Sequence, residues 1–472
     1  MLKKYYDFFC SLWFIKKEFR LKVLLLSSTF LLMMACVAIW RPLKMSIFAK
    51  LVGSEFVPSA KLYTLFFLVP LIIFYSKLVD RLRRHQLLYC FTIFHGIIGI
   101  IFYFVLSHPV YGIENTVTSP TRLTGWAFYF FMESFAAFLT TVFWSFADSI
   151  NNPKDAKNYY GFFVSGSKIG SIIAAGSLYI SLTFFGNVKD HILLPNTLLI
   201  GSLLLFSAAL CIYFLIKFVP GYYMHGYEAV YQMEKKKKPD PKEQKSILQN
   251  TKESIKNSLE GLIIMIKNPY VLGIFSIIIF YEIIIVIFDY RVLRFADQTY
   301  KTAGGIAAYY ALFYIWMNVI GLIFSFFGTT PILRLLGTRL SLFIFPAICI
   351  IILITTMLFP SSSAFFASFV LLRAVNYALN HPTREILYIP TTKSIKFKAK
   401  AWTDAFGSRM GKGIGSAFNI SLRGAAPMFA LITSMSFCLS LTMAWIIVVF
   451  FLGKTLQNAV NNKKIIGEEK AE

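Results

Sequence analysis

The sequence predicts an all-α polytopic membrane protein with twelve transmembrane helices, arranged as two halves of six. Of its 472 residues, 57% are hydrophobic and only 15% are charged, whereas soluble domains are about 25% charged. The apolar runs are long and continuous, as membrane-spanning helices of about 20 residues require. A closed β-barrel would show short alternating segments instead. The composition excludes a soluble nucleic-acid-binding protein despite a net charge of +24.

Each predicted helix is an apolar run long enough to cross a bilayer. The predicted spans are, in order, 22–50, 60–79, 86–107, 123–148, 159–185, 194–216, 270–290, 304–328, 338–359, 363–390, 402–424 and 427–453.

The basic residues orient these spans. With both termini in the cytoplasm, thirty of the 47 Lys and Arg residues fall in cytoplasmic segments, and few fall in the outer loops. This asymmetry follows the positive-inside rule. We therefore expect a multi-pass protein of the bacterial inner (plasma) membrane with cytoplasmic termini.

Charge and proline also divide the chain into domains. The run Lys235–Lys238, followed by Pro-Asp-Pro, marks a linker whose charge sets orientation; binding of anionic lipid at the inner leaflet is the alternative. The predicted parts are an amphipathic cytoplasmic N-terminal segment (1–21), a first six-helix half (22–219), the basic cytoplasmic linker (220–257), a second six-helix half (258–453) and a cytoplasmic tail (454–472).

A short repeat supports the division into halves. Gly166-Ser-Lys-Ile-Gly-Ser171 resembles Gly411-Lys-Gly-Ile-Gly-Ser416, and each follows a cytoplasmic basic loop. Its position matches a 6+6 pseudo-symmetric duplication, the arrangement of major-facilitator-like transporters, whose substrate site lies between the halves.

Charged residues inside the predicted spans point to function. Each costs about 2.5–3.5 kcal/mol at the bilayer centre, so the central ones must pair or face a wet cavity. Lys61, near a helix end, is interpreted as a side chain that reaches the interface without a functional role. The central set is Arg41, Lys44, Glu133, Lys168, Glu282, Asp289, Arg373, Arg384, Glu385, Arg409 and Lys412.

Spacing groups the cations of this set. Arg41 and Lys44 are three residues apart and share a helix face, as do Arg409 and Lys412, while Arg384 follows Pro382. Since cations outnumber carboxylates, the set suits an anionic, phosphorylated substrate. The alternative is internal ion pairing, for example between Arg384 and Glu133 or Asp289.

Other patterns argue against an enzyme. The six cysteines have no metal-binding spacing, and no nucleophile–base pair is visible. The run from Gly407 to Gly413 fails as a phosphate loop because its spacing is one residue short and no Ser or Thr follows Lys412. Gly407, Gly411 and Gly415 form a stripe that favours close helix packing over substrate contact. We expect no cofactor and no bound metal.

Several motifs resemble the nucleotide transporters of the ATP/ADP translocase type, found in obligate intracellular bacteria and plastids. The resemblance covers nearly the whole chain. The similar segments are Arg41-Pro-Leu-Lys44, Glu133-Ser-Phe, Phe143-Trp-Ser-Phe-Ala-Asp148, the loop from Pro153 to Gly161, Pro382-Thr-Arg384-Glu385-Ile-Leu-Tyr-Ile-Pro390 and the run from Lys400 to Lys412.

The resemblance implies a large central cavity and exchange of adenine nucleotides, or import of other nucleotides. It also implies that four charged positions matter to transport: Lys44, Glu133, Asp289 and Arg384. The sequence departs from the family pattern at four positions, which are Met45, Asp289, His381 and Arg384. It also has Lys168 where the family often has Asn.

The resulting hypothesis is a monomeric secondary transporter that exchanges ATP for ADP by alternating access. Lys44, Arg384 and Arg41 would hold the phosphates, while Arg409 and Lys412 add positive potential. Lys168 is a further candidate substrate-binding residue. Glu133 and Asp289 would pair with these cations in the empty site. One alternative is proton-coupled uptake of another nucleotide or organic phosphate; another is a non-transporting receptor or scaffold. No nucleic-acid partner is expected.

Overall fold

The computed structural model describes residues 17–151, 153–184, 189–220, 261–324, 329–392, 394–462 and 464–467. Most of the predicted N-terminal segment, the linker beyond residue 220 and residues 468–472 of the tail lie outside the described residues.

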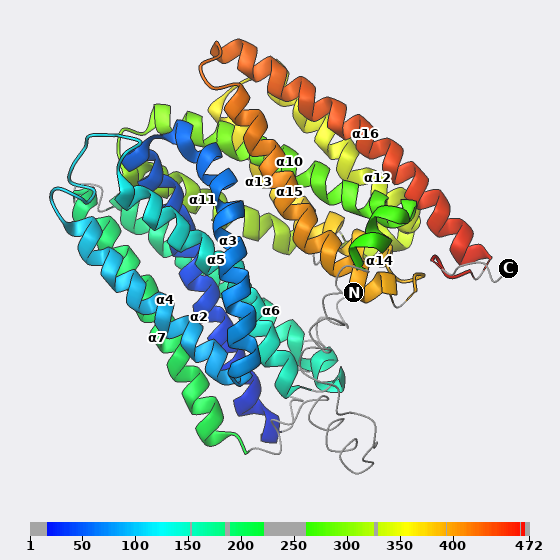
Figure 1. Cartoon of the computed structure of the whole chain (residues 1–472), viewed down its shortest axis with the longest axis horizontal. Coiled ribbons are helices and arrows are strands. Elements are labelled where there is room, and N and C mark those ends of the chain that lie inside the picture. The colour runs from blue at the N-terminus through cyan, green and yellow to red at the C-terminus, as the bar shows by residue number, and fades with distance from the viewer. Residues whose placement is uncertain are drawn as a thin grey trace. The chain divides into compact units, whose positions relative to one another are not determined.

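The described chain is built of long helices, and no β-strand forms among these residues apart from a single isolated bridge between Thr391 and Ile466 (Figure 1). Every predicted span corresponds to one helix, or in one case to two. The helices are α2 (Lys17–Phe48), α3 (Val57–Arg81), α4 (Arg84–Ser107), α5 (Leu123–Ile150), α6 (Pro153–Phe184), α7 (Asp190–Phe218), α10 (Pro269–Thr299), α11 (Ala303–Ile323), α12 (Thr329–Leu358), α13 (Ser362–Val375) with α14 (His381–Ile386), α15 (Lys400–Ser421) and α16 (Pro427–Asn461).

Ten helical segments of the described chain are long and apolar enough to cross a membrane. Two features account for the difference from twelve. The first predicted span and most of the second belong to one continuous helical segment, Phe19–Ile72, because short π and 3₁₀ turns join α2 to α3. The span predicted at 402–424 is α15, which is absent from the ten because its glycines, serines and charged residues lower its hydropathy.

Local sequence explains where several helices begin and break. The Asn268 side chain accepts hydrogen bonds from the backbone N–H groups of Tyr270 and Val271, and Pro269 occupies the first turn, so α10 begins with a capped end. Gly337 interrupts α12 with a φ of 70°, a conformation that glycine adopts without a steric penalty. The apolar part of α12 starts just after it, where the sequence predicts a span from 338.

The chain divides into two compact units. The first unit comprises residues 1–52, 67–241 and 302–315, and the second comprises 53–66, 242–301 and 316–472. Within the first unit, α2 packs against α6, α7 and α5, and α4 packs against α7. Trp40 of α2 is fully buried, and its indole N–H donates a 3.2 Å hydrogen bond to the Leu198 carbonyl.

Helix α10 forms the core of the second unit. It packs against α15, α16 and α13, while α12 packs against α16, and it is buried along most of its length. A glycine stripe permits the close approach of α15. A Cβ atom at Gly411 would lie 2.7 Å from the Glu282 Cβ and 2.9 Å from the Ile279 carbonyl oxygen. This geometry agrees with the packing role predicted for the stripe.

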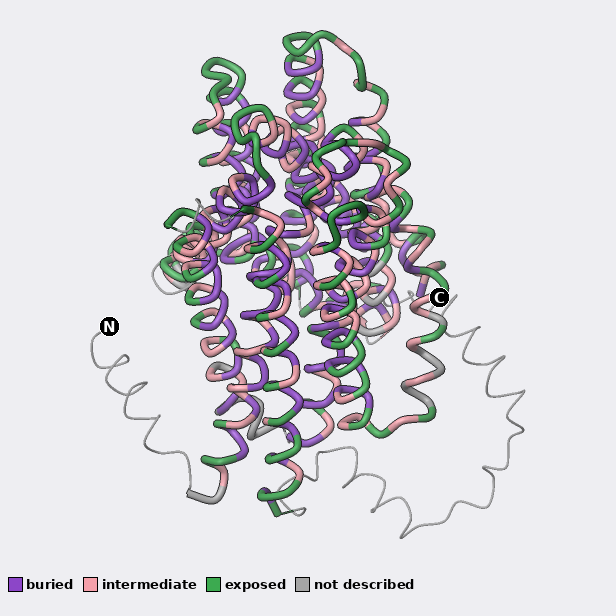
Figure 2. The backbone as a smooth tube through the Cα atoms, turned by 90° about the vertical axis from the view of Figure 1, so that its left-hand side faces the viewer, coloured by how far each residue is buried: buried purple, intermediate pink, exposed green. Residues whose placement is uncertain are grey.

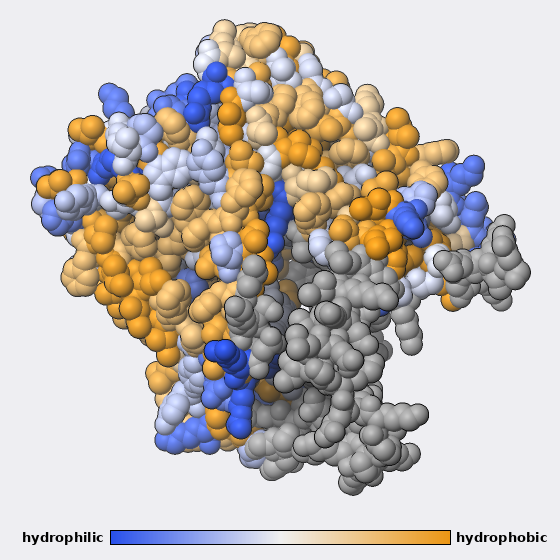
Figure 3. Space-filling model, viewed as in Figure 1, coloured by the Kyte–Doolittle hydropathy of each residue, from blue (hydrophilic) through white to orange (hydrophobic). Residues whose placement is uncertain are grey.

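The helices present apolar side chains outward, as a bilayer requires. Buried turns run through the middle of the helices, and many exposed turns lie at loops and helix ends (Figure 2). On α4 the exposed residues Phe94, Ile97, Ile101 and Phe104 follow helical spacing along one face. Hydrophobic side chains cover much of the described surface in Figure 3. The protein is therefore a multi-pass, all-helical membrane protein.

Candidate functional site

The eight candidate residues divide equally between the two units. The first unit holds Arg41, Lys44, Glu133 and Lys168, and the second holds Asp289, Arg384, Arg409 and Lys412. None of the eight is fully buried, and all but Lys412 are half-buried.

In the first unit, Lys44 of α2 forms an ion pair with Glu133 of α5. The Lys44 Nζ lies 2.5 Å from the Glu133 Oε1, with 16% and 24% of the two side chains exposed. The ammonium also lies 5.0 Å from the centre of the Tyr129 ring, a distance that permits a cation–π interaction. Two predicted site residues of opposite charge are therefore in contact.

Arg41 lies about one turn before Lys44 on α2, next to Pro42. Because residues three apart share a helix face, its guanidinium carries positive charge on the face that holds Lys44. No ion pair joins Arg41 to another residue in the described part of the chain. Lys168 is half-buried on α6, the helix that packs most extensively on α2.

In the second unit, Asp289 of α10 forms an ion pair with Lys61 of α3. Only 14% of the Lys61 side chain and 13% of the Asp289 side chain are exposed. The interpretation of Lys61 as a residue reaching toward the interface is therefore wrong, because its ammonium is held by an intramembrane carboxylate. The sequence offers one signal: Asp289 is a carboxylate inside a predicted span and so requires a cation, but spacing does not identify that cation as Lys61.

Arg384 lies after a break in the tenth predicted span. A π-helical turn, Asn376–Asn380, separates α13 from α14, and Pro382 follows it. Proline lacks the N–H that would continue the helical pattern, so the backbone departs from regular α-helix here. The Arg384 guanidinium lies 3.9 Å from the Asp404 carboxylate. The ion-pair partner of Arg384 is therefore Asp404, and not Glu133 or Asp289 as the alternative above suggests.

A second ion pair supports this break. Lys400, at the start of α15, pairs with Glu385, the residue after Arg384. The Lys400 ammonium also lies 5.2 Å from the centre of the Tyr388 ring. The Tyr270 hydroxyl donates a 2.9 Å hydrogen bond to the Leu387 carbonyl, which ties the end of α14 to α10. Residues of α10, α14 and α15 thus fix the backbone that carries Arg384.

Arg409 and Lys412 both lie on α15, beside the glycine stripe that packs on α10. Arg409 is half-buried and Lys412 is exposed. Neither has an ion pair within the described ranges. Ser408, which precedes Arg409 in the sequence, donates a 2.8 Å hydrogen bond to the Glu282 carboxylate on α10.

Each unit presents an ion pair that can bind an anion reversibly. Lys44 and Arg384 each face a carboxylate, and an incoming anion could exchange with that carboxylate while the cation keeps a partner. Arg41, Arg409 and Lys412 add donors that carry positive charge. No group of three or more His, Cys, Asp or Glu residues suited to a metal ion occurs in the described part of the chain.

Comparison with known proteins identifies a family. The model of the TLC ATP/ADP transporter family matches residues 2–370 and 365–456, which together span nearly the whole chain.

Curated relatives carry matching names. ADP,ATP carrier protein 4 of Rickettsia bellii is 24% identical over an alignment covering 93% of this chain and 89% of the relative. ADP,ATP carrier protein 1 of Chlamydia pneumoniae is 21% identical, with 89% of this chain and 88% of the relative covered.

Solved structures show the same fold. The nucleoside transporter NupG, in a mutant form, aligns with a TM-score of 0.55 at 15% identity, covering 90% of this chain and 99% of that chain. A bacterial homologue of the iron transporter ferroportin, in an inward-facing state, aligns with a TM-score of 0.57 at 13% identity, covering 92% and 100%. The predicted major-facilitator-like fold is confirmed.

Proposed function

Because the chain belongs to the TLC ATP/ADP transporter family, we propose that it exchanges ATP for ADP across a membrane by alternating access. The observation that carries this proposal is the match of the family model to nearly the whole chain. The family and the similar folds are transporters, so an enzymatic role is excluded.

The charged residues supply the mechanism. We propose that Lys44, Arg384 and Arg41 bind the nucleotide's phosphates, and that Arg409, Lys412 and Lys168 make the surroundings positive. In the absence of nucleotide, Glu133 neutralises Lys44 and Asp404 neutralises Arg384. Asp289 acts through Lys61, its observed partner, so Lys61 joins the functional set.

Exchange follows if the ion pairs of the empty site oppose the conformational change. A nucleotide that displaces Glu133 or Asp404 takes over as the partner of Lys44 or Arg384 and frees the carboxylate. This exchange of partners lowers the free energy of one conformation relative to another. Only such differential binding shifts a conformational equilibrium. When the site is empty, the carboxylates again bind the cations, and the conformational change becomes unfavourable. Transport in one direction therefore requires a nucleotide for the return step.

We further propose that the protein lies in a bacterial inner membrane with both termini in the cytoplasm. The distribution of Lys and Arg between loops supports this orientation. Nucleotide would then be exchanged between the bacterial cytoplasm and the space outside the inner membrane.

Efflux from liposomes tests this function. Purified protein is reconstituted with radiolabelled ADP inside, and release is measured on adding external ATP, other nucleotides or buffer alone. Exchange predicts release only when a nucleotide is added. Release driven by an imposed pH gradient in the absence of external nucleotide would instead support the proton-coupled alternative.

A further inference from the structure

The second unit contains a cavity of about 660 Å³ that the proposed exchange does not use. It lies where α10 ends and where α15 is followed by α16, the end that the charge distribution predicts to be outside. Its volume is within the range of small-molecule pockets, about 300–1,000 Å³. None of the eight candidate residues above lines it.

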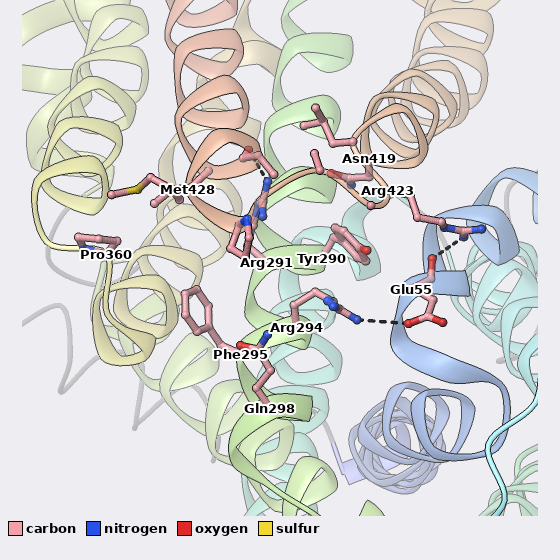
Figure 4. Close-up of a pocket in the computed structure, with 16 residues that line it drawn as sticks. Glu55, Tyr290, Arg291, Arg294, Phe295, Gln298, Pro360, Asn419, Arg423 and Met428 are labelled. Atoms are coloured by element: carbon pink, nitrogen blue, oxygen red, sulfur yellow. Dashed lines mark hydrogen bonds and ion pairs between the residues drawn. The ribbon is translucent and has the colours of Figure 1, made fainter.

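Three arginines and one carboxylate line this cavity. Arg291 and Arg294 come from α10, and Arg423 comes from the turn after α15, whereas Glu55 is the sole acidic residue in the described lining. Figure 4 shows Glu55 between Arg294 and Arg423. The lining therefore carries a surplus of positive charge, which favours an anion.

The Glu55 carboxylate holds Arg294 weakly. Its carboxylate lies 3.5 Å from the Arg294 guanidinium, and 37% and 49% of the Arg294 and Glu55 side chains are exposed. Arg423 donates a 2.5 Å hydrogen bond to the backbone carbonyl of Glu55 rather than to its carboxylate. An exposed, single-contact ion pair contributes little stability, so a stronger anion could displace this carboxylate.

Arg291 is fixed by neutral partners. Its guanidinium donates to the Ala430 carbonyl and, over 2.7 Å, to the Ser434 hydroxyl, both on α16. No ion pair neutralises it in the part of the chain that the structure describes. The cavity also reaches Pro427 and Met428, in the first turn of α16, where the helix dipole adds positive potential.

One wall is apolar. Phe295, Pro360 and Met428 line the side of the cavity away from Glu55 and Arg423 (Figure 4). A small inorganic ion would leave this wall uncovered. An organic phosphate would place its phosphate against the arginines and its apolar or aromatic part against these side chains.

We propose that this cavity binds the phosphate group of an organic phosphate, with Glu55 as an internal competitor for Arg294. The ligand is either a free phosphate compound, such as a nucleotide, or a phospholipid headgroup. Binding here is independent of the proposed exchange, because none of the residues assigned to transport lines the cavity.

A cysteine at the cavity rim reports occupancy. Met428→Cys is introduced into full-length protein in which Cys10, Cys90 and Cys211 are replaced by Ser; Cys36, Cys349 and Cys438 are buried. Maleimide labelling of the purified protein is timed with and without tripolyphosphate, ATP or dihexanoyl-phosphatidylglycerol. Gln298→Cys, from the same lining, provides a second reporter if Met428→Cys folds poorly.

At saturating ligand, labelling should slow by about fivefold or more. Protection by tripolyphosphate or ATP assigns the site to free phosphate compounds, and protection by the phospholipid alone assigns it to a headgroup. The double variant Arg294→Gln/Arg423→Gln should raise the half-protecting concentration about tenfold. Glu55→Gln should lower it, since the competing charge is removed.

Two controls make the result specific. Arg339→Gln removes the same charge from the same unit, outside this cavity, and should leave protection unchanged. Lys44→Ala/Arg384→Ala, which impairs the proposed transport site, should also leave protection intact. The proposal is overturned if no compound slows labelling, if the arginine double variant is protected like the parent, or if Lys44→Ala/Arg384→Ala abolishes protection.

Discussion

Lys44 of α2 and Glu133 of α5, which are 89 positions apart in the sequence, form an ion pair with an N–O distance of 2.5 Å inside the first unit. An anionic substrate would be attracted by Lys44 and would compete with Glu133 for it. The pair therefore connects the fold to the proposed exchange, in which Glu133 holds Lys44 until a nucleotide binds.

The first prediction concerns this pair. Lys44→Ala should abolish nucleotide uptake, because it removes the cation proposed to bind phosphate and breaks the ion pair with Glu133. The charge swap Lys44→Glu/Glu133→Lys should restore thermal stability toward that of the parent but not uptake, since the cation is moved to another helix. Uptake in liposomes and melting temperature are the measurements. Full uptake by Lys44→Ala would exclude Lys44 from the substrate site.

A second prediction concerns Lys61 and Asp289. Both side chains are largely buried, so Asp289→Asn, which removes the negative charge that Lys61 contacts, should destabilise the protein by about 3–5 kcal/mol. The double variant Lys61→Met/Asp289→Leu should recover most of that loss, because no charge remains buried.

A double-mutant cycle on unfolding, built from Lys61→Met, Asp289→Leu and the double variant, measures the coupling between Lys61 and Asp289. Additive effects of the two single substitutions would show that the ion pair contributes nothing.

The third prediction tests the role of Arg384 in phosphate binding. Arg384→Lys keeps the charge but loses the planar set of donors, so nucleotide affinity should fall about tenfold while exchange persists. Arg384→Ala should eliminate exchange. Inhibition of ATP uptake by unlabelled ATP and ADP gives the affinities. Equal affinities in the parent and Arg384→Ala would show that Arg384 does not contact the substrate.

A fourth prediction separates packing from substrate contact on α15. Gly411→Ala would place a Cβ against α10, where neither the Glu282 Cβ nor the Ile279 carbonyl leaves room. The loss of stability should be about 1–3 kcal/mol. Gly176→Ala on α6 is the matched control, because no described atom lies within 4 Å of its added Cβ. If both variants melt at the parent temperature, the glycine stripe is not a packing surface.

The sequence predicts the helices well because long apolar runs are a local property. All twelve predicted spans correspond to helices, including the span at 402–424, which is α15 and which a simple hydropathy criterion leaves out. Pro382 likewise predicts the irregular backbone near Arg384, because proline acts on its own segment.

Ion-pair partners are less predictable, since they depend on which helices meet. The pairing of Glu133 with a site cation was expected, and the structure identifies that cation as Lys44. The sequence does not identify Lys61 and Asp404 as partners. Lys61 lies near a helix end, and Asp404 lies on a different helix from Arg384, so spacing along one helix does not connect them. Position within a span could not distinguish a buried pair from a side chain that reaches the interface.

The most direct test of the proposed exchange is uptake of radiolabelled ATP by proteoliposomes with and without ADP inside. We predict uptake that requires internal ADP and is lost in Lys44→Ala and Arg384→Ala. Absence of ATP uptake under both conditions, in protein shown to be folded, would contradict ATP/ADP exchange. It would indicate that the departures at Met45, Asp289, His381 and Arg384 accompany a different substrate.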